Sequence, residues 1–378
     1  ACLVGSEMCI RDRNGEKKEN EMTAEEILRE ELKNIIPADR ESMEKAKARW
    51  KSVGKPLFSL GKLEDAVIKI AGIKGKSVYS LDKKGLVIMC ADNGVVAEGV
   101  TQTGQEVTAI VADNFTKKET SVCLMAEVAG ADLFPVDIGM VTDVPSVTRP
   151  EYKVAYGTEN MRKGPAMTRE QAAQAVVNGI QIVRKLVGQG YDILATGEMG
   201  IGNTTTSSAV ISVLLDQDAE EVTGRGAGLS SEGLRRKVEV IRESVRLNQP
   251  DREDALDVLS KVGGLDIAGL AGVFLGGAVC HIPVLIDGFI SSAAALCAVR
   301  MAPECADYML ASHRSGETAG GRVLDALGLS PFLDCNMSLG EGSGAVAAMP
   351  LLDMGLAVYL KMSTFEEINV EQYEEYEK

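Results

Sequence analysis

Hydrophobic positions follow two different patterns along the chain, and the first of them ends at about Ile73. From Met22 to that point, apolar residues recur at the spacing of an amphipathic helix. The three segments with this spacing are "AEEILREELKNII", "MEKAKARWKSV" and "GKLEDAVIKIAGI". Thr23-x-x-Glu26 at the first of them has the form of a capping box, so we expect a helix to begin there.

The second pattern is a recurring unit of a short apolar strand, a turn rich in Gly, Ser, Asp or Asn, and a helix. The expected strands are "LVIMC", "LFPVDIG", "YDILAT", "IPVLI" and "YMLAS", and the helices after four of them are "EVTAIVADNF", "TTTSSAVISVLL", "FISSAAALCAV" and "RVLDALGL". Strands that alternate with helices predict a parallel sheet covered on both faces. Ligands of such sheets bind beyond the carboxyl ends of the strands, so we expect the turns to gather around one cleft.

These patterns predict two domains of unequal size. We expect a doubly wound, Rossmann-like α/β domain over residues 77–344. A smaller helical domain would combine residues 22–76 with 345–378, whose acidic end is expected to be solvated and partly helical. Residues 1–21 are set apart as a non-native leader, because "VGSEMCIRDR" resembles a translated sequencing adapter and lacks the apolar core of a signal peptide.

The composition of the chain argues against several classes of function. The 378 residues carry a net charge of −15 without a basic patch, so we expect no nucleic-acid partner. The nearest approach to a membrane span, Ile267 to Ile286, is interrupted by glycines, His281 and Pro283, so none is expected. The 8 cysteines lack C-x-x-C spacing and there are only 2 histidines, so we expect free thiols in a reducing cytoplasm, rather than disulfides, and no metal site.

The turn "GEMGIGNTTTSSA", Gly197–Ala209, follows an expected strand and opens an expected helix. A helix start presents free N–H groups and the positive end of the helix dipole, which suits a phosphate. The glycine spacing matches neither the dinucleotide fingerprint nor a Walker loop, which also disfavours a dehydrogenase. The alternative is a tight turn in which Thr204 or Thr205 caps the helix.

Other polar positions are less specific. The long turn over residues 91–105 predicts a binding loop, and Thr103-x-x-Glu106 at its end predicts a capping box for the next helix. From the residues alone, Arg314 is expected in a surface salt bridge, and His281 in the core. Lys237 lies among basic residues and is expected on a solvated helix face.

Glu341 stands among three glycines in "LGEGSGA", just before an apolar helix. One interpretation is a carboxylate that caps the helix start, which stabilises by about 1 kcal/mol. The other is a reactive carboxylate. A cap does not need glycine on both sides, so Gly340, Gly342 and Gly344 predict that something approaches the loop backbone closely. The residues alone leave both interpretations open.

From about Ser59 to Tyr359 the chain resembles the nicotinate-nucleotide–dimethylbenzimidazole phosphoribosyltransferases. The resemblance rests on "SLGKLEDAVIKIAGI", "ADNGVVAEGV", "VAYGTENMRKGPAMTREQA", "GEMGIGNTTTSSA", "GRGAGLSSEGLRRKVEV", "DGFISSAAAL", "SHRSGE" and "NMSLGEGSGAVAAMPLLDMG". It implies transfer of phosphoribosyl from nicotinate mononucleotide to 5,6-dimethylbenzimidazole, which gives nicotinate and α-ribazole 5′-phosphate for the lower ligand of cobalamin. It also implies a cytoplasmic homodimer with a cleft between its two domains, and no cofactor.

The resemblance assigns roles to particular residues. Glu341 would accept the proton of the attacking base. The substrate-binding residues would be Glu198, Gly200, Gly202, Asn203, Thr204, Lys237, Ser315, Gly316, Leu339 and Gly340, with Thr101 and Gln105 at the base pocket.

The chain departs from the family pattern in three places. Leu57 and Phe58 replace Pro-Gly in "KPLFSLG". Thr318 to Gly320 replace Pro-Gly-His after Glu317, and Ser338 replaces a common arginine. Two alternatives are kept: the same chemistry on another lower-ligand base (adenine, another benzimidazole or a phenolic), and a nucleotide-binding protein without catalysis.

Overall fold

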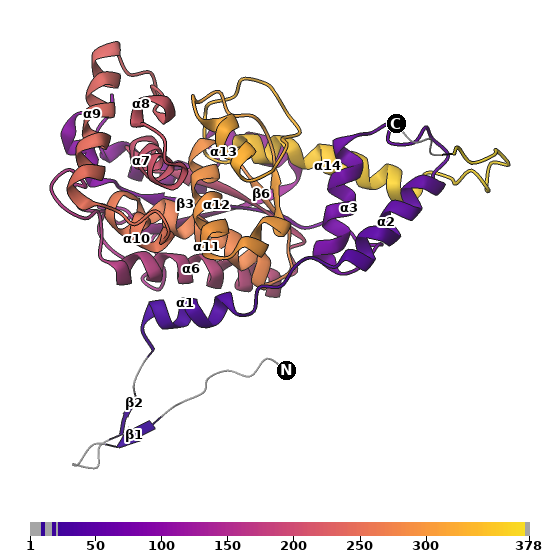
Figure 1. The fold of residues 1–378 in the computed structure, drawn as a ribbon, viewed down its shortest axis with the longest axis horizontal. Coiled ribbons are helices and arrows are strands. Elements are labelled where there is room, and N and C mark those ends of the chain that lie inside the picture. The colour runs from indigo at the N-terminus through magenta and orange to yellow at the C-terminus, as the bar shows by residue number, and fades with distance from the viewer. Residues whose placement is uncertain (1–8, 12–16, 20–21, 375–378) are drawn as a thin grey trace.

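A five-stranded parallel sheet forms the centre of the protein (Figure 1). The structure is a computed structural model that describes residues 9–11, 17–19 and 22–374. The strands are β3 (Lys84–Ala91), β4 (Ala131–Gly139), β5 (Ile193–Met199), β6 (Val284–Ile286) and β7 (Met309–Ala311). All five strands predicted from the sequence are present, so the predicted α/β class is confirmed.

The strands lie in the order β4-β3-β5-β6-β7. Along the chain, strands are therefore added first to one side of β3 and then to the other. From β3 the chain adds β4 on one side, then returns past β3 and adds β5, β6 and β7 on the other. The loops that leave β3 and β5 therefore diverge at the carboxyl edge of the sheet. A crevice at such a reversal is the usual ligand site of doubly wound sheets.

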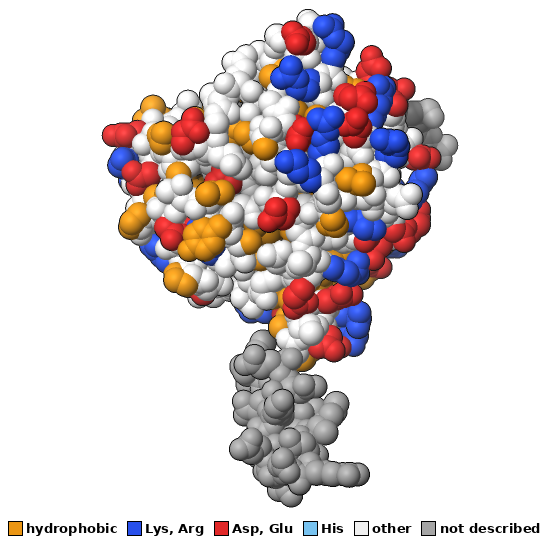
Figure 2. Space-filling view, turned by 90° about the vertical axis from the view of Figure 1, so that its left-hand side faces the viewer, with side chains coloured by type: hydrophobic (Ala, Val, Ile, Leu, Met, Phe, Trp, Pro, Cys, Tyr) orange, Lys and Arg blue, Asp and Glu red, His pale blue; other side chains and the backbone are white. Residues whose placement is uncertain are grey.

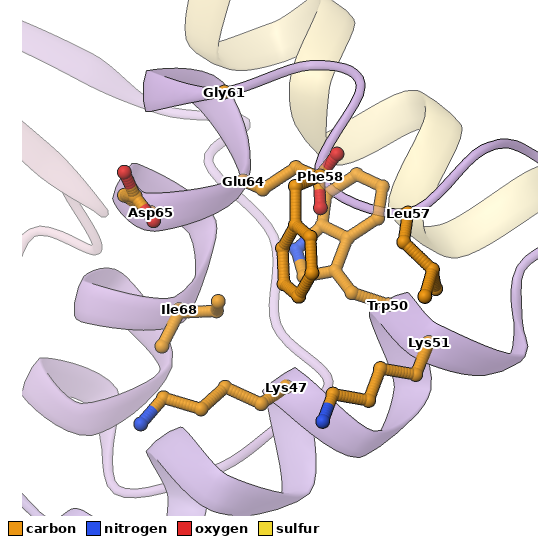
Figure 3. Close-up of a pocket in the computed structure, with 9 residues that line it drawn as sticks. All are labelled: Lys47, Trp50, Lys51, Leu57, Phe58, Gly61, Glu64, Asp65 and Ile68. Atoms are coloured by element: carbon orange, nitrogen blue, oxygen red, sulfur yellow. The ribbon is translucent and has the colours of Figure 1, made fainter. Parts of the chain in front are cut away.

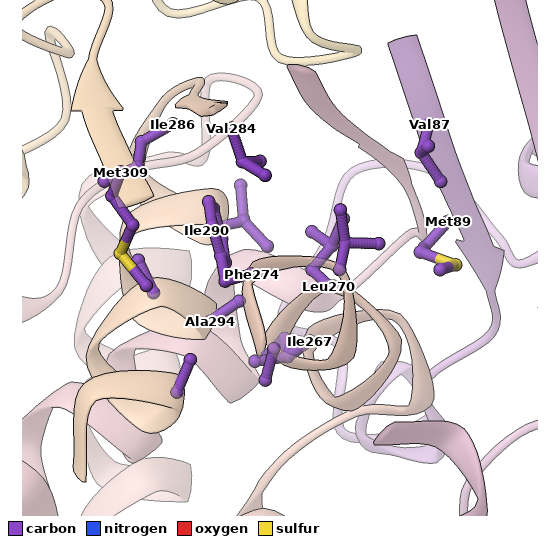
Figure 4. Close-up of a cluster of buried hydrophobic side chains, with 14 of the residues drawn as sticks. Val87, Met89, Ile267, Leu270, Phe274, Val284, Ile286, Ile290, Ala294 and Met309 are labelled. Carbon is purple, nitrogen blue, oxygen red and sulfur yellow. The ribbon is translucent and has the colours of Figure 1, made fainter. Parts of the chain in front are cut away.

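The strands are continuously apolar because helices cover both faces of the sheet. In β3 every residue after Lys84 is buried. Successive side chains of a strand point to opposite faces: Val87 and Met89 lie on the side of α11 (Leu265–Val279), as Figure 4 shows. Leu86 points the other way, toward the start of α14 (Ser343–Lys361).

The layer on the first face is built around α11. This helix packs against β3, β4 and β5, and against α6 (Arg169–Gly188) and α12 (Phe289–Met301). On the other face α14 packs against β5 and against α5 (Ser121–Ala129). The remaining elements of this part are η1 (Gly94–Glu98), α4 (Glu106–Lys117), α7 (Asn203–Leu215), α8 (Ala219–Val222), α9 (Ser231–Asn248), α10 (Ala255–Val262), η2 (Pro303–Tyr308) and α13 (Gly320–Ala326).

The three N-terminal helices occupy two places (Figure 1). The predicted capping box starts α1 (Ala24–Leu32), which packs against α6. In contrast, α2 (Arg40–Ser52) and α3 (Lys62–Lys74) pack on each other, and α14 packs on α3. The division into domains at 22–76, 77–344 and 345–378 stays a prediction.

The two ends of the chain contain little regular structure among the described residues. Within the expected leader, β1 (Cys9–Arg11) pairs antiparallel with β2 (Lys17–Glu19), and the rest of residues 1–21 lies outside the described residues. The expected partial helix of the acidic tail is wrong for residues 363–374, which contain turns and no helix. Phe365 is the buried side chain there, and one apolar residue cannot anchor a helical face.

The longest apolar helix and most of the described cysteine side chains are buried in the protein. By length and composition α14 could cross a membrane, but 56% of its apolar window is buried, as in the core helix of a soluble protein. The segment that came nearest to a membrane span in the sequence, residues 267–286, forms most of α11 together with β6. The six described cysteine side chains are free, and four of them are buried.

Helices α6 and α11 cross so closely that glycine is required at the contact. A β-carbon on Gly272 would overlap the Val176 carbonyl, and one on Gly179 would overlap the Gly269 carbonyl. Gly188, at the end of α6, has open space around it. We expect Gly272→Ala to lower the free energy of unfolding by about 1–3 kcal/mol through overpacking.

Gly188→Ala is the matched control and should stabilise by about 0.5–1 kcal/mol, because it only removes backbone freedom from the unfolded chain. Urea unfolding of both variants measures these changes. Equal stability of the two variants would contradict the close crossing.

Candidate active site

A cavity of about 190 Å³ opens at the carboxyl edge of the sheet. Its walls come from the loops after β5, β6 and β7 and from the segment before α14. Predicted site residues that line it are Glu198, Gly200, Asn203, Thr204, Ser315, Leu339, Gly340 and Glu341. The strand ends therefore bring together residues that are up to 143 positions apart in the sequence.

The loop that carries Glu341 has an unusual backbone. Gly340, Glu341 and Gly342 have φ values of 85°, 63° and 95°. A β-carbon at Gly340 would lie 2.5 Å from Glu198 Oε1, and one at Gly342 would lie 2.5 Å from Leu86 Cδ1. The glycines therefore allow the loop to lie against β5 and β3, and the closest approach that they permit is to the protein itself.

Asp287, which follows β6, holds this loop in place. Its carboxylate accepts the N–H groups of Gly342 (3.2 Å) and Ala345 (2.9 Å) at the start of α14. Complete burial raises the pKa of Asp287 to about 6, and these N–H donors oppose the rise. The capping interpretation of Glu341 is therefore wrong for α14, because Asp287 takes that position.

The side chain of Glu341 points elsewhere. One carboxylate oxygen, Oε2, is buried and has no hydrogen-bond partner. Burial raises the pKa of Glu341 above its usual value, and the N–H of Val122, in the first turn of α5, opposes the rise. Glu341 is thus a partly buried carboxylate with an unused acceptor oxygen, on a loop that is fixed at its backbone.

Two more carboxylates lie beneath the cavity without a cation between them. Asn203 donates its side-chain amide both to Glu198 Oε2 and to Asp266 Oδ2, the latter at 3.1 Å. Glu198 Oε1 also accepts the backbone N–H of Glu341 at 3.4 Å. Burial raises the pKa of Glu198 and of Asp266 to about 7 each. The floor of the site is therefore acidic and holds protons near neutral pH.

The start of α7 forms another wall. Gly202, at φ 95°, is its N-cap residue, so the predicted caps Thr204 and Thr205 are wrong. Thr204 instead accepts a hydrogen bond from Lys237 Nζ at 2.8 Å. Lys237 is buried, contrary to the expected solvated position, and burial lowers its pKa to about 8 against the opposing charge of Glu317. One ammonium thus stands directly behind the wall made by Thr204.

The remaining predicted residues lie around the cavity rather than in its lining. Gln105 donates to the Asn93 carbonyl at 3.1 Å, and the Thr101 hydroxyl donates to the Thr103 carbonyl. Gly316 is exposed. The predicted Thr103–Glu106 capping box is wrong: α4 has Gln105 as its N-cap residue, without a side-chain cap bond.

Sequence reasoning missed Asp287 and assigned no role to His313, which lines the cavity with Nδ1 3.0 Å from Ser312 Oγ. The sequence signal for both residues was their position within two residues of the end of an apolar strand. Arg314 meets the expectation of a surface ion pair, with Asp334 at 3.8 Å. His281 is exposed and contacts the Tyr308 hydroxyl, so its expected core position is wrong.

Two further features concern metal binding and surface charge. Among the residues that the structure describes, no group of three or more His, Cys, Asp or Glu side chains is arranged to hold a metal ion. On the face shown in Figure 2, Lys and Arg side chains are interspersed with Asp and Glu. The geometry is that of a small-molecule site with an acidic floor and one buried ammonium.

Comparison with known proteins places the chain in a family. Residues 35–370 match a family model described as "Phosphoribosyltransferase". The chain is 49% identical to the nicotinate-nucleotide–dimethylbenzimidazole phosphoribosyltransferase of Acetivibrio thermocellus, over 92% of this chain and 99% of that protein. It is 42% identical to the Escherichia coli protein of the same name, over 90% and 95% of the two chains.

A solved structure agrees with the sequence comparisons. The crystal structure of CobT from Thermus thermophilus superposes with a TM-score of 0.83 at 38% identity, over 88% of this chain and 100% of that one. The protein is a phosphoribosyltransferase by fold and family. It belongs to the nicotinate-nucleotide–dimethylbenzimidazole phosphoribosyltransferase family.

The acidic floor has a consequence for stability. Asp266 keeps its proton in the folded protein to about pH 7, whereas an unfolded aspartate releases it near 3.8. The folded state then binds more protons between these values, so this group's contribution to stability falls as pH rises from about 4 to about 7. Asp266→Asn should make the pH dependence of the unfolding free energy measurably flatter over this range.

Asp325→Asn, at an exposed position on α13, is the control and should leave the profile unchanged. Urea unfolding at several pH values measures the slopes. The same slope in the parent and in Asp266→Asn would contradict the retained proton.

Proposed function

We propose that this protein transfers the phosphoribosyl group of nicotinate mononucleotide to 5,6-dimethylbenzimidazole, releasing nicotinate and forming α-ribazole 5′-phosphate. The observation that carries the proposal is Glu341, a carboxylate residue that lines the cavity and does not cap α14. The relatives' name supports the choice of substrates. A cytoplasmic homodimer belongs to the same proposal and rests on the family resemblance.

The reaction needs only one base. One azole nitrogen attacks C1′ of the ribose while the other carries a proton that must leave, and Glu341 would accept that proton. Nicotinate leaves from a pyridinium nitrogen and takes the bonding electron pair with it, so its ring nitrogen becomes neutral without a general acid. A glycosidase, in contrast, needs two carboxyl groups because its leaving oxygen must be protonated.

The neighbouring groups would bind and stabilise the sugar phosphate. Lys237, behind Thr204, supplies positive charge beside the N-terminus of α7, where a phosphate is favoured. Asp287, whose pKa stays lower because backbone N–H groups donate to it, would place negative charge on the side of C1′, where positive charge develops as the pyridinium leaves. Its burial makes this interaction stronger than it would be in water.

The first test is analysis of the products by mass spectrometry after mixing the protein with nicotinate mononucleotide and dimethylbenzimidazole. We expect nicotinate and ribazole phosphate from the parent. Glu341→Gln should slow product formation by about 10²–10⁴-fold, because the amide cannot accept the azole proton. Exposed Glu304→Gln is the control and should keep the parent rate.

Three outcomes would revise the proposal. Equal rates for the parent and Glu341→Gln would remove Glu341 as the base and leave the reaction in place. Product with adenine or a phenolic, but none with dimethylbenzimidazole, would change the acceptor. Nucleotide binding without product from any base would favour a binding protein without catalysis.

Lys237 gives a second prediction. Lys237→Met keeps most of the buried volume and removes the charge, so we expect the KM for nicotinate mononucleotide to rise about 10–100-fold, the loss of one charged hydrogen bond. Arg246→Met, exposed on the same helix α9, is the control and should change KM little. Steady-state kinetics measure both, and an unchanged KM for Lys237→Met would contradict a phosphate-binding role.

A further inference from the structure

His313 is a buried side chain of the candidate active site that takes no part in the proposed proton transfer. It follows β7, lines the cavity and is only 4% exposed. The other histidine of the chain, His281, is exposed and does not line the cavity. His313 is therefore a polar group that the fold removes from bulk water and places at the cavity.

The imidazole ring of His313 is held at one edge and open at the other. A β-carbon on Gly344, in the first turn of α14, would overlap Nδ1, so the ring lies directly against this glycine. Nδ1 itself is 3.0 Å from Ser312 Oγ. At the other edge, a β-carbon on Gly288 would lie 3.7 Å from Cε1 and 3.9 Å from Nε2, and Gly288 also lines the cavity. Nε2 has no hydrogen-bond partner among the residues that the structure describes, so it faces the cavity unpaired.

The Ser312 hydroxyl determines which nitrogen of the ring carries the proton. Its oxygen also lies 3.4 Å from the Asp287 carbonyl oxygen, to which it donates its single proton. The hydroxyl oxygen can then accept the Nδ1–H of His313. Burial lowers the pKa of His313, so the ring is uncharged at neutral pH and holds one proton. With that proton on Nδ1, Nε2 is a hydrogen-bond acceptor.

An acceptor at this place selects among the groups of the nucleotide. The 5′-phosphate and the nicotinate carboxylate are themselves acceptors at neutral pH, so neither pairs with an unprotonated nitrogen. The azole N–H of the second substrate is directed to Glu341 in the proposed transfer. The donors that remain are the 2′- and 3′-hydroxyl groups of the ribose.

The place of His313 within the cavity also matches a ribose. Gly226, whose β-carbon would lie 3.5 Å from Lys237 Nζ, belongs to the wall proposed for the phosphate. Gly344, against which the His313 ring lies, comes three residues after Glu341, the residue proposed to act beside C1′. The ribose of a bound nucleotide connects its 5′-phosphate to C1′, so it must cross the cavity between these two walls.

We propose that Nε2 of His313 accepts a hydrogen bond from a ribose hydroxyl group of the nucleotide, and that this contact makes the site prefer a ribose to a deoxyribose. The inference rests on the proposed phosphoribosyl transfer for the identity of the nucleotide. His313 forms and breaks no covalent bond. It orients the sugar so that C1′ stays within reach of the attacking nitrogen.

A second cavity, of about 280 Å³, lies between α2 and α3 and shares no lining residue with the candidate active site (Figure 3). Its Lys47 is paired with Glu44 at 2.6 Å, and its Glu64 is paired with Lys55 at 2.5 Å. With these charges paired, the second cavity is a poorer phosphate site than the wall beside Lys237. We therefore expect one nucleotide per chain.

Isothermal titration calorimetry of the full chain, without an acceptor base, tests the contact and the stoichiometry. The probes are nicotinate mononucleotide and its 2′-deoxy and 3′-deoxy analogues. We expect one analogue to bind about 5–10-fold more weakly than the ribonucleotide, through the loss of one hydrogen bond. His313→Asn keeps an N–H beside Ser312 and removes Nε2, so it should bind that analogue and the ribonucleotide equally.

Two more variants complete the test. His281→Asn changes the exposed histidine and should keep the preference of the parent protein. Ser312→Ala leaves the imidazole ring in place but no longer fixes its proton on Nδ1, so it should reduce the preference. It tests the contact even if His313→Asn does not fold, which circular dichroism checks.

Equal binding of the three nucleotides by the parent protein would overturn the proposal. So would an unchanged preference in folded His313→Asn or, if that variant does not fold, in Ser312→Ala. A product assay with dimethylbenzimidazole separates this inference from the proposed reaction. A ribose preference in binding, without product, would contradict the reaction and leave the role of His313. Product formation together with equal binding of the three nucleotides would do the reverse, and no binding of any nucleotide would overturn both.

Discussion

The candidate active site depends on one buried carboxylate. Asp287 follows β6 and accepts two backbone N–H groups at the start of α14, so a segment more than 50 residues further along the chain is held at the sheet edge. The desolvation cost of such a carboxylate is offset only while those donors are in place. The left-handed backbone of the Glu341 loop therefore persists because Asp287 determines where the loop ends.

The position of Asp287 decides between two roles that the sequence allowed for Glu341. A glutamate before a helix can cap that helix or react, and sequence alone could not distinguish the two for Glu341. The structure assigns the cap to Asp287, which follows β6, and Glu341 Oε2 has no hydrogen-bond partner. The proposed base is available because another acid performs the structural task.

Much of the fold could be predicted because its signals are local. The five strands are short apolar runs before turn residues, and the periodicity of α1, α2 and α3 was visible in 13-residue windows or less. What failed depends on tertiary contacts. The burial of Lys237 and the Asn203 bridge between Glu198 and Asp266 need residues that are distant in sequence. The predicted capping box was right for α1 and wrong for α4, whose N-cap residue is Gln105 without a side-chain cap bond.

Helix α14 connects features that otherwise have no contact. Its first residue follows Glu341 and Gly342, and Tyr359 near its last turn packs on Trp50. Its 19 residues span roughly 28 Å at the usual rise of an α-helix. Pro350 interrupts the backbone ladder within it, because proline has no N–H to donate. Any change in the position of the half that touches α3 would therefore reach the Glu341 loop through a helix that lacks one of its backbone hydrogen bonds.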